Sequence, residues 1–217
     1  PEGCPTINQA MGLAVIFSEK NECTRENPVQ VQVGEGQHVM VGIIAPGIYE
    51  GRHTYVSCNN ITIVGKGKGK TTILGGFYVN GKQNVKFEQL SVTNDAGYGL
   101  VCNGSGTNVD VTECCFKKCQ FSGMDVTTGA TVTATRCDFM ENGEYGVVCH
   151  GTNTKVRLND STMHHNGDDG LYADDHAVVD LHGTKTAIHS NKQDGIVALG
   201  NAKVNIHLPS QHNTSHD

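Results

Sequence analysis

The chain has 217 residues, 37% of them hydrophobic, and a formal net charge of −6. This hydrophobic fraction is low for a compact globule of this size, and the 27 glycines indicate a chain that spends many residues on turns. A nucleic-acid partner is not expected, because phosphate binding needs clustered Lys and Arg. A membrane span is not expected either, because no apolar stretch approaches roughly 18 residues.

Residues 1–27 are expected to form an N-terminal cap. Within it, residues 5–17 (PTINQAMGLAVIF) have the spacing of an amphipathic helix that begins at Thr6. Its apolar face carries Ile7, Ala10, Met11 and Ala14. Such a helix would cover the open end of a stack of strands, whose unpaired edges otherwise invite aggregation.

Short strands are expected to follow the cap. Val29, Val31 and Val33 alternate with polar residues, as in a strand with one buried face. Residues 39–45 form a second apolar run, which ends at the turn sequence 46–50 (PGIYE). Further on, 61–65 (ITIVG) and 72–76 (TILGG) flank a loop rich in Lys and Gly.

A ladder of glycines then repeats every 23–25 residues, at Gly76, Gly99, Gly123, Gly146, Gly170 and Gly195. From Gly99 onward an apolar-x-apolar triplet follows each glycine, such as 147–149 (VVC) or 171–173 (LYA). A second triplet and a third apolar position follow in each period, such as 156–158 (VRL) and Met163. Three short strands per period predict a right-handed parallel β-helix of about seven coils over residues 28–217.

An asparagine also recurs in this register, at Asn142, Asn166 and Asn191, with Cys119 one coil earlier. Asparagine suits a sharp turn, and its amide can bond to the asparagine stacked above it. An antiparallel sandwich also has short strands and frequent turns. It would not repeat Gly, Asn and three apolar positions in constant register, so the β-helix is favoured.

The segments 45–50 (APGIYE) and 61–76 (ITIVGKGKGKTTILGG), after a leading helix and strand, resemble the N-terminal part of the pectin-lyase-like β-helix superfamily. Residues 136–146 (RCDFMENGEYG) resemble repeats of carbohydrate-binding proteins and sugar hydrolases, which also occur in some F-box proteins. The resemblance implies the fold over nearly the whole chain. It implies little about activity, because the matched residues are turn and core positions. The GTVDFIFG-like strand of pectin methylesterases is absent, so esterase activity is not expected.

Arg157, Asp180 and His182 form one candidate site. In the predicted register Arg157 lies one coil, about 4.8 Å, from Asp180, and His182 lies on the same outward face. One interpretation is an acid–base or binding cluster of a polysaccharide lyase, hydrolase or epimerase. The other is a solvated ladder of opposite charges.

Four carboxylates form a second candidate site, at Asp168, Asp169, Asp174 and Asp175. Carboxylate oxygens are ligands that Ca²⁺ prefers, so the cluster predicts a calcium site. The alternative is a pair of solvated turns. No other cofactor is expected.

A third candidate site is an outward apolar and aromatic stripe on the strands that follow the glycines. Its residues are Tyr98, Val101, Tyr145, Val148, Tyr172 and Val197. An exposed stripe of this kind marks an interface or lies beneath another segment. Stacking of sugars on the tyrosines is a third interpretation.

These features favour a non-catalytic binding module that engages a protein or a glycan along the stripe. A polysaccharide-acting enzyme is the alternative, and a structural role in a homo-oligomer or larger assembly is the third hypothesis. Of the nine cysteines, several fall at inward positions, where a free thiol behaves as a small apolar group. Unpaired cysteines favour a reducing intracellular compartment.

Overall fold

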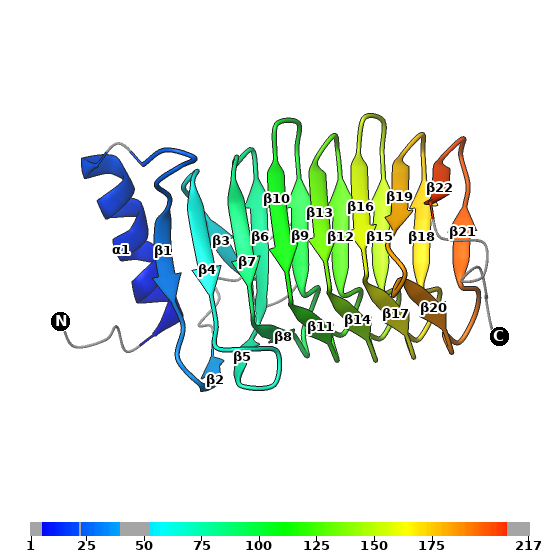
Figure 1. Cartoon of the computed structure of the whole chain (residues 1–217), viewed down its shortest axis with the longest axis horizontal. Helices are drawn as coiled ribbons and strands as arrows, with labels where there is room; N and C mark the ends of the chain where they lie inside the picture. The colour runs from blue at the N-terminus through cyan, green and yellow to red at the C-terminus, as the bar shows by residue number, and fades with distance from the viewer. Residues whose placement is uncertain (1–5, 22, 40–52, 208–217) are drawn as a thin grey trace.

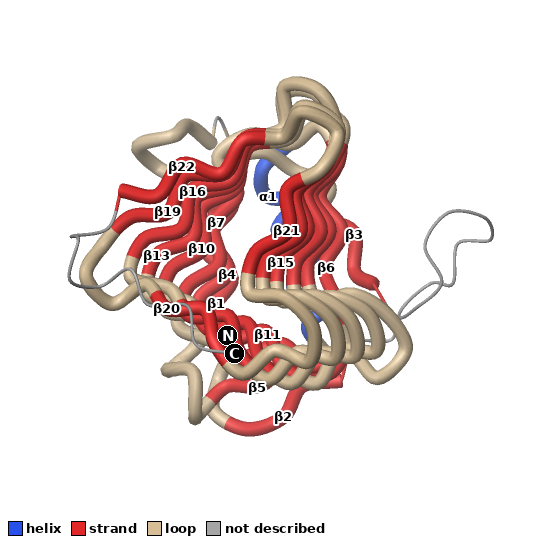
Figure 2. Tube along the Cα trace, turned by 90° about the vertical axis from the view of Figure 1, so that its right-hand side faces the viewer, coloured by secondary structure: helices blue, strands red, loops and turns tan. Residues whose placement is uncertain are grey.

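The structure is a computed structural model that describes residues 6–21, 23–39 and 53–207. The predicted apolar strand at 39–45 and its turn at 46–50 lie outside the described residues, apart from Val39. The described strands form three parallel sheets that wind around one long axis (Figure 1). Seen along that axis, the strands of each sheet are stacked behind one another around a shared interior (Figure 2).

Each coil contributes one strand to each sheet. Sheet 1 consists of β1 (Val29–Gln32), β4 (Ile61–Val64), β7 (Val85–Glu88), β10 (Asn108–Thr112), β13 (Thr131–Thr135), β16 (Lys155–Asn159), β19 (Val178–His182) and β22 (Lys203–His207). Sheet 2 consists of β2 (Gly36–Val39), β5 (Thr71–Leu74), β8 (Ser91–Thr93), β11 (Cys115–Lys117), β14 (Asp138–Met140), β17 (Thr162–His164) and β20 (Ala187–His189). Sheet 3 consists of β3 (His53–Val56), β6 (Gly76–Asn80), β9 (Leu100–Asn103), β12 (Met124–Thr127), β15 (Val147–His150), β18 (Leu171–Asp174) and β21 (Ile196–Ala198). The predicted parallel β-helix and its register are therefore confirmed.

Like side chains stack along the interior because each residue pairs with its counterpart one coil away. Phe116 pairs with Phe139, and their rings stack 5.5 Å apart at 8°. The predicted asparagine ladder is present as well. The side-chain amide of Asn142 donates to Asn166 at 3.0 Å, and that of Asn166 donates to Asn191 at 2.9 Å. These bonds satisfy polar groups that burial would otherwise leave without partners.

The glycine ladder provides close approach between coils. A Cβ atom added to Gly146 would lie 2.6 Å from the carbonyl oxygen of Gly170, and one added to Gly123 would lie 2.9 Å from that of Gly146. Any side chain at these positions would push neighbouring coils apart. The repeat therefore requires glycine for space between coils.

Helix α1 (Ile7–Lys20) covers the N-terminal end of the stack, as predicted (Figure 1). The hydroxyl of Thr6 accepts a hydrogen bond from the backbone N–H of Gln9 at 3.2 Å, which caps the first turn. The helix buries Ile7, Met11 and Ala14 and extends three residues beyond the predicted end. The eight described cysteines are all free thiols, and most are buried.

Candidate functional site

The outer face of sheet 1 brings Arg157, Asp180 and His182 together as predicted. Arg157 pairs in register with Asp180, and His182 follows two residues later on β19. The next coil adds Asn205, which donates to Asp180 at 2.9 Å, and His207, whose Nε2 lies 3.4 Å from the same carboxylate oxygen. The rings of His182 and His207 stack with centroids 4.3 Å apart.

The charges of this cluster are fixed by its surroundings. The hydrogen bond from Asn205 and the nearby His207 hold the pKa of Asp180 below its usual value. Burial, together with the charges of His207 and Arg157, lowers the pKa of His182. At neutral pH the carboxyl is ionised and the imidazole of His182 is neutral. A carboxyl that donates a proton to a leaving group needs a raised pKa instead.

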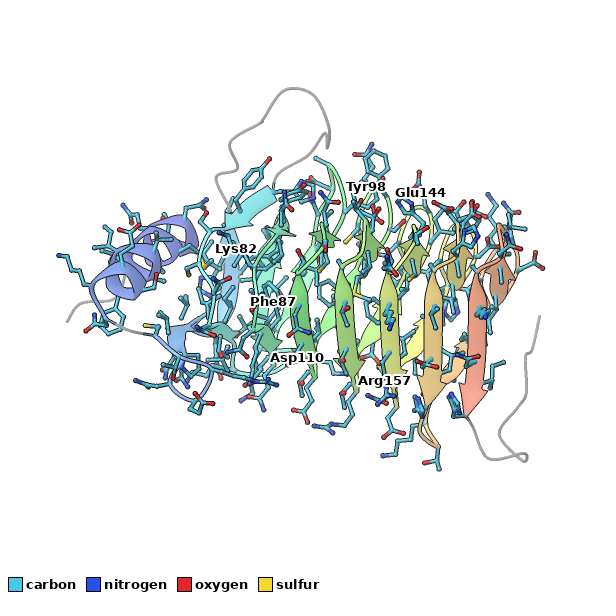
Figure 3. The ribbon with its side chains drawn as sticks, turned by 90° about the horizontal axis from the view of Figure 1, so that it is seen from above. Lys82, Phe87, Tyr98, Asp110, Glu144 and Arg157 are labelled. Carbon is cyan, nitrogen blue, oxygen red and sulfur yellow. The ribbon has the colours of Figure 1, made fainter. Side chains whose placement is uncertain are left out.

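The outer face of sheet 3 lies on a different side of the solenoid, as Figure 3 shows for Tyr98 and Glu144 relative to Asp110 and Arg157. Tyr145 precedes β15, and Tyr172 lies on β18 one coil further along. Their rings lie 5.1 Å apart, tilted by 39°, and both are half-buried. Val148 and Val197 lie in register on either side of Tyr172 and are also half-buried.

The expectation that Val101 belongs to the exposed stripe is wrong, because its side chain is fully buried. Val101 lies in register between Tyr78 and Asp125. A valine side chain reaches less far from a sheet than the tyrosine beside it, so alternation along the strand did not by itself ensure its exposure. Tyr98 is half-buried and packs against Phe121, with ring centroids 5.1 Å apart.

Asp125 interrupts the stripe and was not among the predicted site residues. Its side chain is 6% exposed, and within the described residues its Oδ1 atom has no hydrogen-bond partner. Burial is the main reason that the pKa of Asp125 is raised to about 6. The charge of Glu144 also raises this pKa, whereas the charge of His150 lowers it. A single aspartate in a row of Val and Tyr is the sequence signal that could have identified it.

Glu144 is the more accessible carboxyl of this face. Burial and the charge of Asp168 raise its pKa. Burial, Asp125 and Glu144 in turn raise the pKa of Tyr98 to about 12. Sheet 3 therefore presents an aromatic pair next to acidic groups, and burial raises the pKa of two of them, Asp125 and Glu144. The following residues are together named the sheet-3 face: Tyr98, Asp125, Glu144, Tyr145, Val148, Asp168 and Tyr172.

The four aspartates of the predicted calcium site do not converge. Asp168 and Asp169 precede β18, whereas Asp174 ends that strand and Asp175 follows it. At about 3.3 Å per residue, the two pairs are roughly 16 Å apart, far more than a shared ion allows. Asp169 already accepts the backbone N–H of Asp194 at 2.8 Å, and Asp174 that of Asp175 at 2.6 Å. The two aspartate pairs are close in sequence, but the extended strand β18 holds them apart.

A different group has the geometry to hold a metal. Asp180, His182 and His207 each offer one ligand atom, and these atoms lie within 4.8 Å of one another. The sequence pattern groups Asp180 and His182 with Arg157 as an acid–base or binding cluster, and it does not identify His207 or a metal site here.

A cavity of about 1050 Å³ lies at the other end of the solenoid, between α1 and β1. Leu13, Ile16 and Phe17 of α1 line this cavity and are about half exposed. Within the described part of the chain, no helix is both long and apolar enough to cross a membrane.

Comparison with solved structures finds polysaccharide enzymes among the similar folds. The catalytic domain of a GH87 α-1,3-glucanase in complex with tetrasaccharides matches with a TM-score of 0.61 and 12% identity, over 94% of this chain and 44% of that one. The A-module of mannuronan C-5 epimerase AlgE4 from Azotobacter vinelandii matches with a TM-score of 0.56 and 14% identity, over 93% and 71%. Pectate lyase Pel9A matches with a TM-score of 0.52 and 15% identity, over 82% and 59%.

The chain spans less than half the length of the glucanase domain, and identities this low establish the fold alone. No curated protein matches the sequence. The family model described as "Right handed beta helix region" matches at residues 40–162 and 75–214, which together cover most of the chain. With the parallel register of all three sheets, this match shows the family: the chain belongs to the right-handed β-helix family.

Proposed function

We propose that the sheet-3 face binds a neutral polysaccharide, with Tyr145 and Tyr172 as the stacking platform. The observation that carries the proposal is the tyrosine pair, 5.1 Å apart and half-buried, next to carboxyls on the same outer face. Because the strands climb one coil at a time, the face is a long, straight surface of the kind that an extended polymer can follow (Figure 1).

Sugar rings match this surface chemically. Their C–H faces are apolar and pack on aromatic rings, while their hydroxyl edges donate hydrogen bonds to carboxylates. Tyr145 and Tyr172 supply the aromatic faces, and Glu144 and Asp168 supply acceptors beside them. A binding face of this kind, apolar with a few polar groups, is typical of ligand sites.

The charge of the face favours a neutral glycan over a polyuronate. Asp125, Glu144, Asp168, Asp169 and Asp174 all lie on the outer face of sheet 3 or at its ends. Like charges facing one another across an interface disfavour binding. The glucanase neighbour, crystallised with tetrasaccharides, supports a glycan as the ligand class for this fold.

The test is affinity electrophoresis of the full chain in gels that contain α-glucan, β-glucan, alginate or polygalacturonate. We expect retardation by a neutral glucan, weakened at least tenfold in Tyr145→Ser and Tyr172→Ser, which corresponds to about 1.4 kcal/mol each. Tyr55→Ser is the matched control, because Tyr55 lies in the same row at the far N-terminal end and pairs with Tyr78 instead.

Equal retardation of wild type and the two tyrosine variants would refute the proposal. So would binding to the uronate polymers alone. Capture of a protein partner through the same tyrosines, with no glycan bound, would favour a protein-binding module.

Hydrolysis of the bound glycan is the second candidate, favoured by the raised pKa of Glu144 next to Asp168. A raised pKa suits a carboxyl that protonates a leaving oxygen, and a second carboxylate can assist water. Glu144→Gln should then abolish release of reducing ends but retain glycan binding, because the side-chain oxygen of glutamine can still accept a hydrogen bond from a sugar hydroxyl. If the wild type binds the glycan but releases no reducing ends, the hydrolysis proposal is refuted and only the binding proposal stands.

A further inference from the structure

We propose that Asp180, His182 and His207 bind a divalent transition-metal ion of the Zn²⁺ class on the outer face of sheet 1. The site is separate from the sheet-3 face, and its ligands come from two adjacent strands. Parallel register places His182 of β19 directly opposite His207 of β22. Asp180 lies two residues before His182, so its side chain emerges on the same face.

The distances suit a small ion. The three ligand atoms lie within 4.8 Å of one another, and Oδ1 of Asp180 lies 3.4 Å from Nε2 of His207. Tetrahedral ligands that each lie about 2.1 Å from zinc are about 3.4 Å apart. The Asp180–His207 pair therefore already has the required separation. The ligand atom of His182, at most 4.8 Å from the other two, has to approach them by no more than about 1.4 Å.

The donor set selects the class of metal. Two imidazole nitrogens and one carboxylate oxygen suit zinc, nickel, cobalt or copper, whereas calcium and magnesium prefer oxygen ligands alone. Three protein ligands leave at least one coordination position for water or another molecule.

The surroundings hold the ligands in the form that a metal needs. Asn205 donates to the carboxylate of Asp180 at 2.9 Å and fixes its orientation, as second-shell groups do around metal sites. Nε2 of His182 is buried and has no hydrogen-bond partner within the described residues. An orphaned buried nitrogen costs free energy that a metal bond would recover.

Two features oppose binding, and both are open to test. The rings of His182 and His207 stack at 7°, and lone pairs that lie in parallel ring planes do not meet at one point. One ring has to rotate, which the half-exposed His207 can do because the χ2 angle of histidine is broadly distributed. Arg157, in register with Asp180, places a positive charge beside the ion.

The experiment is calorimetric titration of the full chain with Zn²⁺ in a background where His212 and His216 are replaced by Gln, so that the C-terminal histidines do not contribute. We expect one ion per chain. Binding should weaken at least tenfold in Asp180→Asn, His182→Gln and His207→Gln. Arg157→Gln should bind about two- to fivefold more tightly, since it removes a nearby like charge.

Two variants serve as matched controls. His176→Gln removes an exposed His–Asp pair, in which Nδ1 lies 3.2 Å from Oδ1 of Asp175. His189→Gln removes a histidine that stacks on His164 with centroids 5.1 Å apart. Both should bind zinc as the background chain does.

Retention of the single site in His182→Gln and His207→Gln would overturn the proposal, as would dissociation constants weaker than about 100 μM in the background chain. Loss of binding in the control variants would overturn it as well. Circular dichroism checks that each variant is folded. The visible absorption of Co²⁺ bound to the background chain gives a second readout: a spectrum of oxygen ligands alone contradicts the imidazole site.

Discussion

Asp125 offers the sharpest link between the sheet-3 face and stability, because the fold buries its carboxyl and leaves the Oδ1 atom without a hydrogen-bond partner within the described residues. Its pKa is raised from 3.8 to about 6, chiefly by burial. Folding therefore favours the protonated form. In an unfolded chain the same carboxyl would lose its proton at lower pH, near the value of a free aspartate.

The sign of the pH dependence follows from linkage. Below about pH 4 the carboxyl is protonated in both states and affects stability little. Between about pH 4 and 6 the folded chain binds more protons than the unfolded one, so the free energy of unfolding falls as pH rises. Each pKa unit corresponds to about 1.4 kcal/mol, so a shift of about two units destabilises the fold by about 3 kcal/mol above pH 6.

Asp125→Asn removes this penalty with a side chain of nearly the same shape. We expect the variant to be more stable than wild type by up to about 3 kcal/mol at pH 8 and nearly equal to it at pH 4. Urea denaturation at four or five pH values between 4 and 8 measures the difference. Asp95→Asn, at an exposed loop position, is the control and should leave the pH profile unchanged.

A constant difference between Asp125→Asn and wild type across this pH range would refute the argument. So would a variant that is less stable than wild type at pH 8. A stabilised variant with weaker glycan binding would indicate that the carboxyl is kept for function at a cost in stability.

The internal ladders lead to two further predictions, measured as free energies of unfolding in urea. Asn166→Ala should lower the free energy of unfolding by about 3 kcal/mol, because buried partners on both neighbouring coils lose hydrogen bonds. Asn191→Ala, at the more exposed end of the ladder, should lower it by about 1 kcal/mol. Equal losses in the two variants would contradict the account. Gly146→Ala should cost about 2 kcal/mol or more, since its Cβ would lie 2.6 Å from the oxygen of Gly170. Gly12→Ala in α1, where a Cβ meets nothing within 4 Å, should instead stabilise by about 0.5–1 kcal/mol, and a loss there would count against the helix assignment.

Periodicity explains why so much of the fold was predictable. One unit that repeats Gly, Asn and three apolar positions specifies the register of all coils at once, so Val148 and Tyr172 could be placed next to each other without coordinates. The capping helix was predictable because Thr6 and the apolar spacing after it both mark a helix start. The segment at 40–52 lies outside the described residues, so its predicted strand is untested.

The candidate sites were less predictable, because exposure and distance depend on neighbours in other coils. Val101 was assigned to the surface by its alternation, but it is fully buried. The acidic pairs at Asp168 and Asp174 are close in sequence, yet β18 separates them by its length. Asp125 was missed because its raised pKa depends on its burial and on Glu144, which is distant in sequence but lies on the next coil.

The central functional claim is that a neutral glycan stacks on Tyr145 and Tyr172, and saturation-transfer NMR with a neutral glucan oligosaccharide tests it most directly. Selective irradiation of the aromatic protons should transfer saturation to the C–H protons of the sugar, and the transfer should disappear in the Tyr145→Ser, Tyr172→Ser double variant. Transfer of equal strength in that double variant, or no transfer from the wild type, would contradict the account.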